Sequence, residues 1–244
     1  MPADSPVLVV GAEALRGEVR DAGLTPVDSA DEQPVAVVQG YGPEVGWKIL
    51  SEAALAVRAG ATWYATNTDR TLPSPRGPLP GNGSLVAVLR TALDREPDVV
   101  VGKPQPALFT TAASLAKAER PLAIGDRLDT DIQGAVGAGM DSLLVLTGVS
   151  GPKDLLAAPV ERRPKFVAAD LSGLFRSADQ ACVPVAEVDG WQVARDGDHA
   201  VLTGSGEPVD ALRLLCGVTW DGVPIANVSA GSDAAIELLR GWGL

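Results

Sequence analysis

The sequence has few of the residues on which several enzyme classes depend. Among its 244 residues there are two cysteines and a single histidine, His199. Cys182 and Cys216 are far apart in the sequence and belong to no C-x-x-C pattern, which argues against a disulfide framework and against a zinc site. One isolated histidine leaves no Ser-His-Asp triad and no multi-histidine metal centre to build.

Positive charge and long apolar runs are also scarce. The chain has 20 Lys and Arg against 31 Asp and Glu, a formal net charge of −11. An acidic chain without a basic cluster argues against nucleic acid or an anionic membrane as a partner. No apolar run approaches the roughly 20 residues of a transmembrane helix, and the N-terminal residues do not resemble a signal peptide. We therefore expect a cytoplasmic protein and leave a homo-oligomeric assembly open.

What the chain does contain is an alternation of short apolar runs and helical patterns. Helices are predicted up to Ala22, over Pro43–Ala59 and from Leu85, and Gly23 and Gly60 are stop signals for the first two. Strands are predicted at residues 7–10, 35–38, 62–65, 121–125 and 164–168. This alternation is typical of an α/β fold with parallel strands, and the length is ample for a buried core.

Two aspartates follow the predicted strand at residues 121–125. Asp126 comes directly after it, and Asp131 lies five residues later, where the next helix opens. Both carboxylates are therefore expected at the carboxyl end of a strand, the edge where open α/β sheets bind ligands. Two neighbouring acids repel each other unless a cation lies between them, so the pair suits Mg²⁺. Capping of the following glycine-rich helix by Asp126, Asp129 and Thr130 is the simpler alternative.

A lysine stands beside a predicted helix start. Lys103 precedes Pro104, a residue type favoured at the first position of a helix. The ammonium group would then lie near a helix N-terminus, where the dipole disfavours positive charge. A bound phosphate would remove this conflict by accepting hydrogen bonds from the lysine and from the free helix N–H groups. A solvated surface lysine is the alternative.

A long turn-rich segment follows the predicted strand at residues 62–65. It reads ATNTDRTLPSPRGPLPGNGS and contains four prolines and three glycines. So long a loop within a compact domain is usually functional. Asn67 and Asp69 are expected to face a substrate or to support the loop that does, and an Asx-type turn with no further role is the alternative.

Taken together, the Gly-Lys-Pro at Lys103 and the segment GDRLDTDIQGAVGAGMDSLLVLTGVS resemble the third and fourth motifs of the haloacid dehalogenase superfamily of phosphohydrolases. Within it, the second segment is similar to the group with a large α/β cap, called class IIA, and the ATNTD and PGNG segments fit the same group. The resemblance extends over residues 7–176. It implies an α/β Rossmann-like core with an α/β cap, a Mg²⁺ cofactor, and hydrolysis of a small phosphorylated metabolite such as glycerol 3-phosphate or 2-phosphoglycolate.

The resemblance also implies roles for individual residues. Lys103 would be catalytic and hold the phosphate, Asp126 would bind the metal directly, and Asp131 would support the metal shell. Asn67 and Asp69 would bind substrate.

Three parts are expected along the chain. Residues 1–98 would form the cap and residues 99–177 the C-terminal part of the core. Residues 178–244 would form a small α+β appendage, because a hairpin pattern around a Gly-Asp turn is followed by two amphipathic helices. This appendage loosely resembles the acetyltransferase-like extension of actinobacterial members. Trp191, Trp220 and Trp242 are expected to be its core.

One motif of the family is not found in these residues. In the family, an Asp-x-Asp after the first core strand supplies the attacking aspartate and the acid that protonates the leaving group. Asp129-Thr130-Asp131 belongs instead to the acidic turn, and Asp196-Gly197-Asp198 to the predicted hairpin. The aspartyl-phosphate route needs that nucleophile. We therefore expect a core that is incomplete at its N-terminus and no phosphatase activity from the chain as written. A non-catalytic remnant that binds a metal and an anion is the alternative.

Overall fold

The computed structural model describes all 244 residues, which form two compact units, Met1–Leu108 and Phe109–Leu244. Each unit has its own sheets and its own buried core. No helix in Met1–Leu244 combines the length and the apolar character needed to cross a membrane. The α/β class predicted from the sequence is confirmed.

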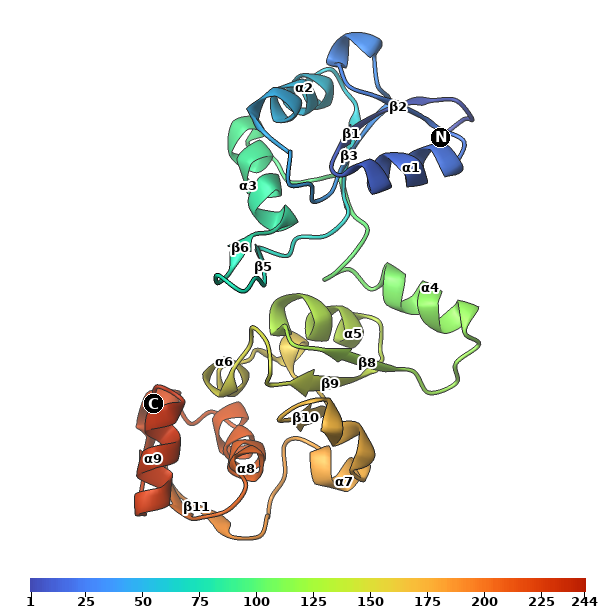
Figure 1. Cartoon of the computed structure of the whole chain (residues 1–244). Helices are drawn as coiled ribbons and strands as arrows, with labels where there is room; N and C mark the ends of the chain where they lie inside the picture. The colour runs from blue at the N-terminus through green and yellow to red at the C-terminus, as the bar shows by residue number, and fades with distance from the viewer. The chain divides into compact units, whose positions relative to one another are not determined.

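The first unit is built on a five-stranded parallel sheet with the order β2-β1-β3-β4-β7. Helix α1 covers one face, and α2 and α3 cover the other (Figure 1). A two-stranded antiparallel hairpin, β5–β6, lies in the turn-rich segment. The elements are β1 (Pro6–Val10), α1 (Glu13–Asp21), β2 (Thr25–Val27), η1 (Ala30–Glu32), β3 (Ala36–Gln39), α2 (Trp47–Arg58), β4 (Thr62–Ala65), β5 (Thr71–Leu72), β6 (Leu79–Pro80), α3 (Asn82–Leu93) and β7 (Val99–Val100).

The apolar runs form strands because both faces of this sheet are covered. Val7 and Val9 of β1 pack in the cluster that includes Val19 of α1, on one face. Leu8 and Val10 point the other way, into the cluster with α2 and α3. Successive side chains of a strand face opposite sides, so a strand buried on both faces reads as a continuous apolar run.

The helix predicted over Pro43–Ala59 is wrong at its start, because α2 begins at Trp47. Gly46 is extended, with φ −133° and ψ −174°, and the residues before it form a loop. This loop packs closely on the end of β1. A Cβ atom at Gly42 would lie 2.7 Å from the carbonyl carbon of Gly11, so only glycine fits there.

The second unit contains a three-stranded parallel sheet with the order β10-β9-β8. The strands predicted at residues 121–125 and 164–168 are confirmed as β8 and β10. The helix α4 lies at the boundary of the two units. The elements of this part are α4 (Ala107–Leu115), β8 (Leu122–Gly125), the π-helical turn η2 (Leu128–Ile132), α5 (Gln133–Gly137), β9 (Asp141–Val145), α6 (Pro152–Leu156), η3 (Val160–Arg162), β10 (Phe166–Ala168), η4 (Leu171–Phe175) and α7 (Ala178–Ala181).

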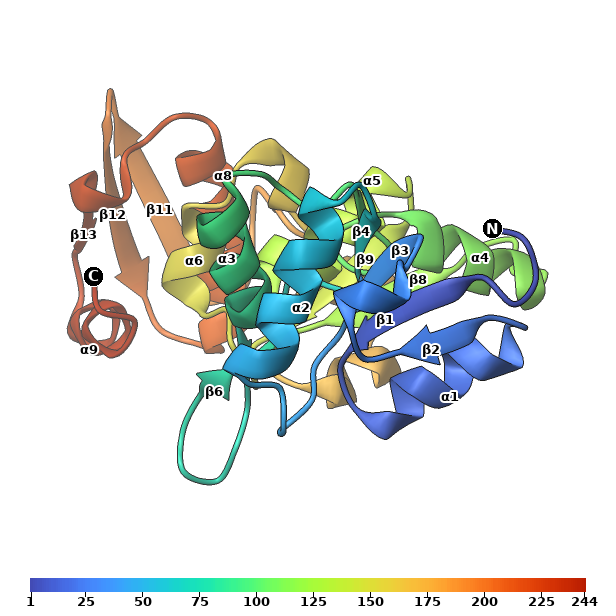
Figure 2. The same ribbon diagram turned by 90° about the horizontal axis from the view of Figure 1, so that it is seen from above.

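The C-terminal segment forms a three-stranded sheet with two main helices, and β11, β12 and β13 lie side by side in Figure 2. The predicted hairpin is confirmed: β11 and β12 are antiparallel, and Gly197 at the turn has a φ of +61°. The sequence pattern missed β13, which pairs in parallel with β12. The elements are β11 (Trp191–Asp196), β12 (His199–Gly204), α8 (Pro208–Trp220), η5 (Ile225–Asn227), β13 (Val228–Ala230) and α9 (Asp233–Gly241).

The three tryptophans pack in a hydrophobic core, as expected, but this core extends beyond the C-terminal segment. Trp191 is buried in one contiguous cluster with Leu128 and Leu144, and Trp220 and Trp242 pack against the same cluster. The indole Nε1 of Trp220 donates a hydrogen bond to the carbonyl oxygen of Leu155 at 3.0 Å. The C-terminal segment therefore shares its hydrophobic core with the sheet that carries the acidic turn.

Candidate functional site

The acidic turn lies where the sequence predicts it, at the carboxyl end of β8. The side chain of Asp126 accepts a hydrogen bond at Oδ2 from the backbone N–H of Val149 at 2.8 Å. The side chain of Asp131 accepts one at Oδ2 from the N–H of Arg127 at 3.1 Å. Each carboxylate is thus oriented by a backbone donor. Arg127 is the N-cap residue of η2, so the Asp131 bond lies at the start of that turn. The Asp126 bond goes to the distant Val149, so helix capping does not explain Asp126.

Glycines make room for both carboxylates. A Cβ atom at Gly148 would lie 1.9 Å from Oδ2 of Asp126. A Cβ atom at Gly125 would lie 2.6 Å from Oδ2 of Asp131. Any larger residue at either position would force the carboxylate to move. The two glycines therefore belong to the site, although their role follows from contacts between segments and not from the spacing of the aspartates.

The third carboxylate of the turn has a different partner. The guanidinium of Arg127 lies 3.1 Å from the carboxylate of Asp129, and the Arg127 side chain is only 9% exposed. Ser150 accepts a hydrogen bond at Oγ from the N–H of Leu128 at 3.0 Å, and its own N–H donates to the carbonyl of Asp126 at 2.9 Å. The turn is therefore held at several points, with Asp129 paired to an arginine.

The chemistry of Asp126 and Asp131 suits a hard divalent cation. Mg²⁺ takes oxygen ligands and is commonly held by one or two carboxylates together with waters and substrate phosphates. Across Met1–Leu244, no group of three or more His, Cys, Asp or Glu side chains is placed to hold a metal ion. Asp126 and Asp131 can therefore supply the protein carboxylates of a Mg²⁺ site whose other ligands are waters and substrate phosphates.

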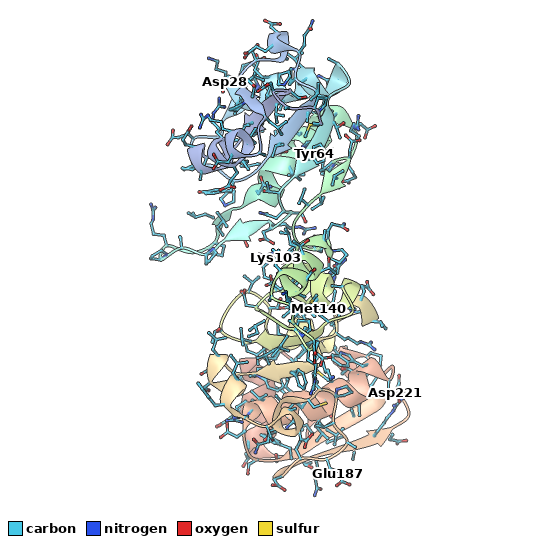
Figure 3. The ribbon with its side chains drawn as sticks, turned by 90° about the vertical axis from the view of Figure 1, so that its right-hand side faces the viewer. Asp28, Tyr64, Lys103, Met140, Glu187 and Asp221 are labelled. Carbon is cyan, nitrogen blue, oxygen red and sulfur yellow. The ribbon has the colours of Figure 1, made fainter.

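Lys103 lies in the segment between β7 and α4, where Figure 3 labels it. The predicted helix start at Pro104 is wrong, because α4 begins at Ala107. Lys103 Nζ lies 3.6 Å from Oδ2 of Asp69. The carbonyl of Lys103 also accepts a hydrogen bond from the N–H of Thr68 at 3.4 Å. Contacts with the loop after β4, not a helix dipole, therefore define its surroundings in this unit.

The loop after β4 contains both other predicted residues. Oδ1 of Asn67 accepts a hydrogen bond from the N–H of Asp69 at 3.1 Å, so these residues form the Asx-type turn that was the alternative to a substrate role. Asn82 Nδ2 donates to the carbonyls of Asn67, at 2.8 Å, and of Gln39, at 3.3 Å. Trp63 Nε1 donates to Oε1 of Gln39 at 3.0 Å. Gln39, Trp63 and Asn82 thus form a buried polar platform that supports the loop.

The sequence reasoning missed this platform. Gln39 is completely buried and Asn82 is 1% exposed. A glutamine at the end of an apolar strand was a visible signal, since buried amides require partners. The structure brings Asn67, Asp69 and Lys103 together in the first unit and places Asp126 and Asp131 in the second.

Comparisons with known proteins identify what the chain resembles. The HAD-hydrolase-like family matches residues 100–174, and the GCN5-related N-acetyltransferase like domain matches residues 188–244. The chain is 42% identical to the D-glycerol 3-phosphate phosphatase of Mycobacterium tuberculosis over 253 residues, which cover 98% of this chain and 71% of that protein. It is 33% identical to an acid sugar phosphatase of Staphylococcus haemolyticus over 69% of this chain and 63% of that protein.

Solved structures agree with these matches. A crystal structure of glycerol phosphate phosphatase from M. tuberculosis in complex with magnesium superposes with a TM-score of 0.88 at 42% identity, covering 99% of this chain and 73% of that one. The p-nitrophenyl phosphatase from Archaeoglobus fulgidus gives a TM-score of 0.61 at 32% identity, covering 70% of this chain and 66% of that one. The chain therefore spans about two thirds to three quarters of the length of these solved structures.

Proposed function

Because the chain belongs to the haloacid dehalogenase-like hydrolases, we propose that it carries the cap and part of the core of a Mg²⁺-dependent phosphatase for small phosphorylated metabolites. Glycerol 3-phosphate or 2-phosphoglycolate are the substrates that the resemblance favours. The observation that carries this proposal is the 42% identity to a D-glycerol 3-phosphate phosphatase over 98% of the chain. The two aspartates held at the end of β8 support it.

The proposed parts are a cap at residues 1–98, a core segment at residues 99–177 and an appendage at residues 178–244. The compact units divide near Leu108, and the first family match begins at residue 100, which supports the proposed boundary between cap and core. The second family match begins at residue 188, inside the proposed appendage. The shared core makes the appendage a structural support for the core segment. It is not proposed to be an independent catalyst.

Each site residue has a proposed role. Asp126 would bind Mg²⁺ directly and Asp131 would support its ligand shell, and the bound ion would supply positive charge against the transferring phosphate. The ammonium of Lys103 would hold phosphate oxygens and stabilise the charge that develops on them. Asn67 and Asp69 would shape the substrate side of the site. In a catalytically competent form, Lys103→Met should lower kcat by roughly 100-fold or more, and near-normal turnover of that variant would refute the role.

We further propose that residues 1–244 alone are inactive, because they lack an activated nucleophile. Asp196 and Asp198 flank a hairpin turn. His199 is exposed and has Ser229 as its hydrogen-bond partner, at 2.9 Å. Cys216 is buried, and this burial raises the pKa of its thiol. The attacking aspartate would have to come from an Asp-x-Asp strand that these residues do not contain.

The alternative is a non-catalytic protein that binds a metal and an anion. The same lack of a nucleophile favours it. Calorimetric titration of residues 1–244 with Mg²⁺ and with inorganic phosphate tests the part that both proposals share. Binding of Mg²⁺ should be lost in Asp126→Ala and kept in Asp28→Asn, whose carboxylate pairs with Arg16 on α1. Absence of Mg²⁺ binding in the unaltered chain would leave the two aspartates without their proposed role. Turnover by a version that includes an Asp-x-Asp strand then separates the enzyme from the alternative.

A further inference from the structure

We propose that Asp69 is a positioning residue for Lys103. Only the purpose of this positioning, which is to hold the lysine for phosphate, rests on the proposed function. Oδ2 of Asp69 lies 3.6 Å from Nζ of Lys103, within the range of an ion pair. The Asp69 side chain is 18% exposed and the Lys103 side chain 36%. A carboxylate shielded to this extent acts on a neighbouring charge with less screening than one in open solvent.

The backbone links the same two segments. The N–H of Thr68 donates to the carbonyl of Lys103 at 3.4 Å. One residue before the lysine, Gly102 lies so close to the loop that a Cβ atom would be 2.1 Å from the carbonyl oxygen of Thr66. The segment after β7 and the loop after β4 therefore meet at three successive points, and the ion pair is the last of them.

The loop that carries Asp69 is itself fixed. The N–H of Gly83 donates to the carbonyl of Asp69 at 2.8 Å, and a Cβ atom at Gly83 would lie 2.2 Å from the carbonyl oxygen of Thr68. Nδ2 of Asn82 also donates a hydrogen bond to the carbonyl of Asn67, at 2.8 Å. A lysine has a flexible four-carbon stem, so a carboxylate held this firmly limits where the ammonium can lie.

The charge of Asp69 argues against contact with the phosphate itself. A carboxylate and a phosphate repel each other at short range, so Asp69 is a poor direct ligand for the substrate's charged end. Its Oδ1 is buried and has no hydrogen-bond partner. A buried polar atom without a partner is costly, and the contact with Lys103 is the side-chain interaction that the structure gives this carboxylate.

Competitive acetylation of residues 1–244 tests this inference without requiring catalysis. Peptide mass spectrometry reports the modification of Lys103 relative to Lys48 and Lys117, which are both exposed. Asp69→Asn should raise this ratio by roughly two- to fivefold, because loss of this ion pair leaves the amine less restrained and more open to the reagent. Asp69→Glu keeps a carboxylate and should return the ratio toward that of the unaltered chain. A general loosening of the fold would also raise the reference lysines and would not be reversed by Asp69→Glu.

Asp28→Asn is the matched control, since Asp28 also forms an ion pair in the first unit, with Arg16 at 2.7 Å. It should leave the ratio unchanged. An unchanged ratio in folded Asp69→Asn would overturn the inference. If that variant does not fold, the test uses the unaltered chain. Raising NaCl from about 0.05 to about 1 M should then increase the ratio, because salt screens the Asp69–Lys103 ion pair. A ratio that stays constant would overturn the inference. Absence of phosphatase activity in a version extended with an Asp-x-Asp strand, with these ratios as expected, would refute the proposed function alone.

Discussion

The carboxylate of Asp126 and the backbone N–H of Val149 form a hydrogen bond of 2.8 Å, which joins the end of β8 to the loop that follows β9. The residue before Val149 is Gly148, and its lack of a side chain is what allows this approach. The position of the proposed metal ligand therefore depends on a glycine 22 residues away along the chain.

Gly148→Ala should displace the Asp126 carboxylate, because the new Cβ atom would lie 1.9 Å from its Oδ2. Changes that disturb the support of a metal ligand typically weaken metal affinity by roughly 10- to 100-fold. We expect a loss of that size in the Mg²⁺ affinity of residues 1–244, measured by calorimetry. An unchanged affinity would show that Asp126 does not bind the ion from the position seen here.

Gly17→Ala is the matched control for that substitution. Gly17 lies inside α1, and nothing comes within 4 Å of the position that its Cβ atom would take. Alanine in a helix interior is favoured over glycine by roughly 0.5–1 kcal/mol, so urea unfolding should show a stabilisation of that size. The Mg²⁺ affinity should not change, and a parallel loss in this variant would mean that the effect of Gly148→Ala is not local.

Arg213→Ala should destabilise the second unit. The Arg213 side chain is 7% exposed and lies 2.8 Å from the carboxylate of Asp210, and it also donates to the carbonyls of Asp179 and Cys182. Removing one partner of a buried charged network costs about 3 kcal/mol or more. Urea unfolding measures this cost. Arg240→Ala on the exposed surface of α9 should change stability by less than about 0.5 kcal/mol, and an equally small effect at Arg213 would contradict the network's role.

Cys216 should resist alkylation in the folded protein. Burial in α8 raises the pKa of its thiol, and the nearby charge of Arg163 only partly opposes this. Below its ordinary pKa of 9.0 the thiol is neutral in both states, and above it only the unfolded chain ionises, so stability should fall as the pH rises past 9. In a Cys182→Ser background, iodoacetamide should modify Cys216 only after urea is added. Rapid native labelling would contradict this burial.

The fold was predictable where apolar runs are buried on both faces. Strand β4 has the predicted bounds, and β1 begins one residue before the predicted run. Strand β2 was missed because it has three residues and contains Pro26, so no apolar run marks it. The start of α2 was misplaced because the contact between Gly42 and Gly11 holds the preceding residues as a loop.

The candidate site was predictable only for residues that sequence spacing connects. Asp126 and Asp131 are five residues apart, and a strand end fixes where both lie. The surroundings of Lys103 were not predictable, because the contact with Asp69 joins residues from different loops. Gly148 and Gln39 were missed for the same reason, since their roles depend on tertiary contacts. The assignments of Lys103, Asn67, Asp69, Asp126 and Asp131 to catalysis, substrate and metal remain predictions.

The central proposal is that this chain carries the metal and phosphate residues of a phosphatase, and that turnover requires an Asp-x-Asp strand that residues 1–244 do not contain. The most direct measurement is a parallel assay of residues 1–244 and of a version extended upstream with such a strand, using an aryl phosphate and Mg²⁺. The account predicts turnover only in the extended version, abolished by Asp126→Ala and unaffected by Asp28→Asn. Turnover by residues 1–244 at a rate near that of the extended version, with the same loss in Asp126→Ala, would contradict it.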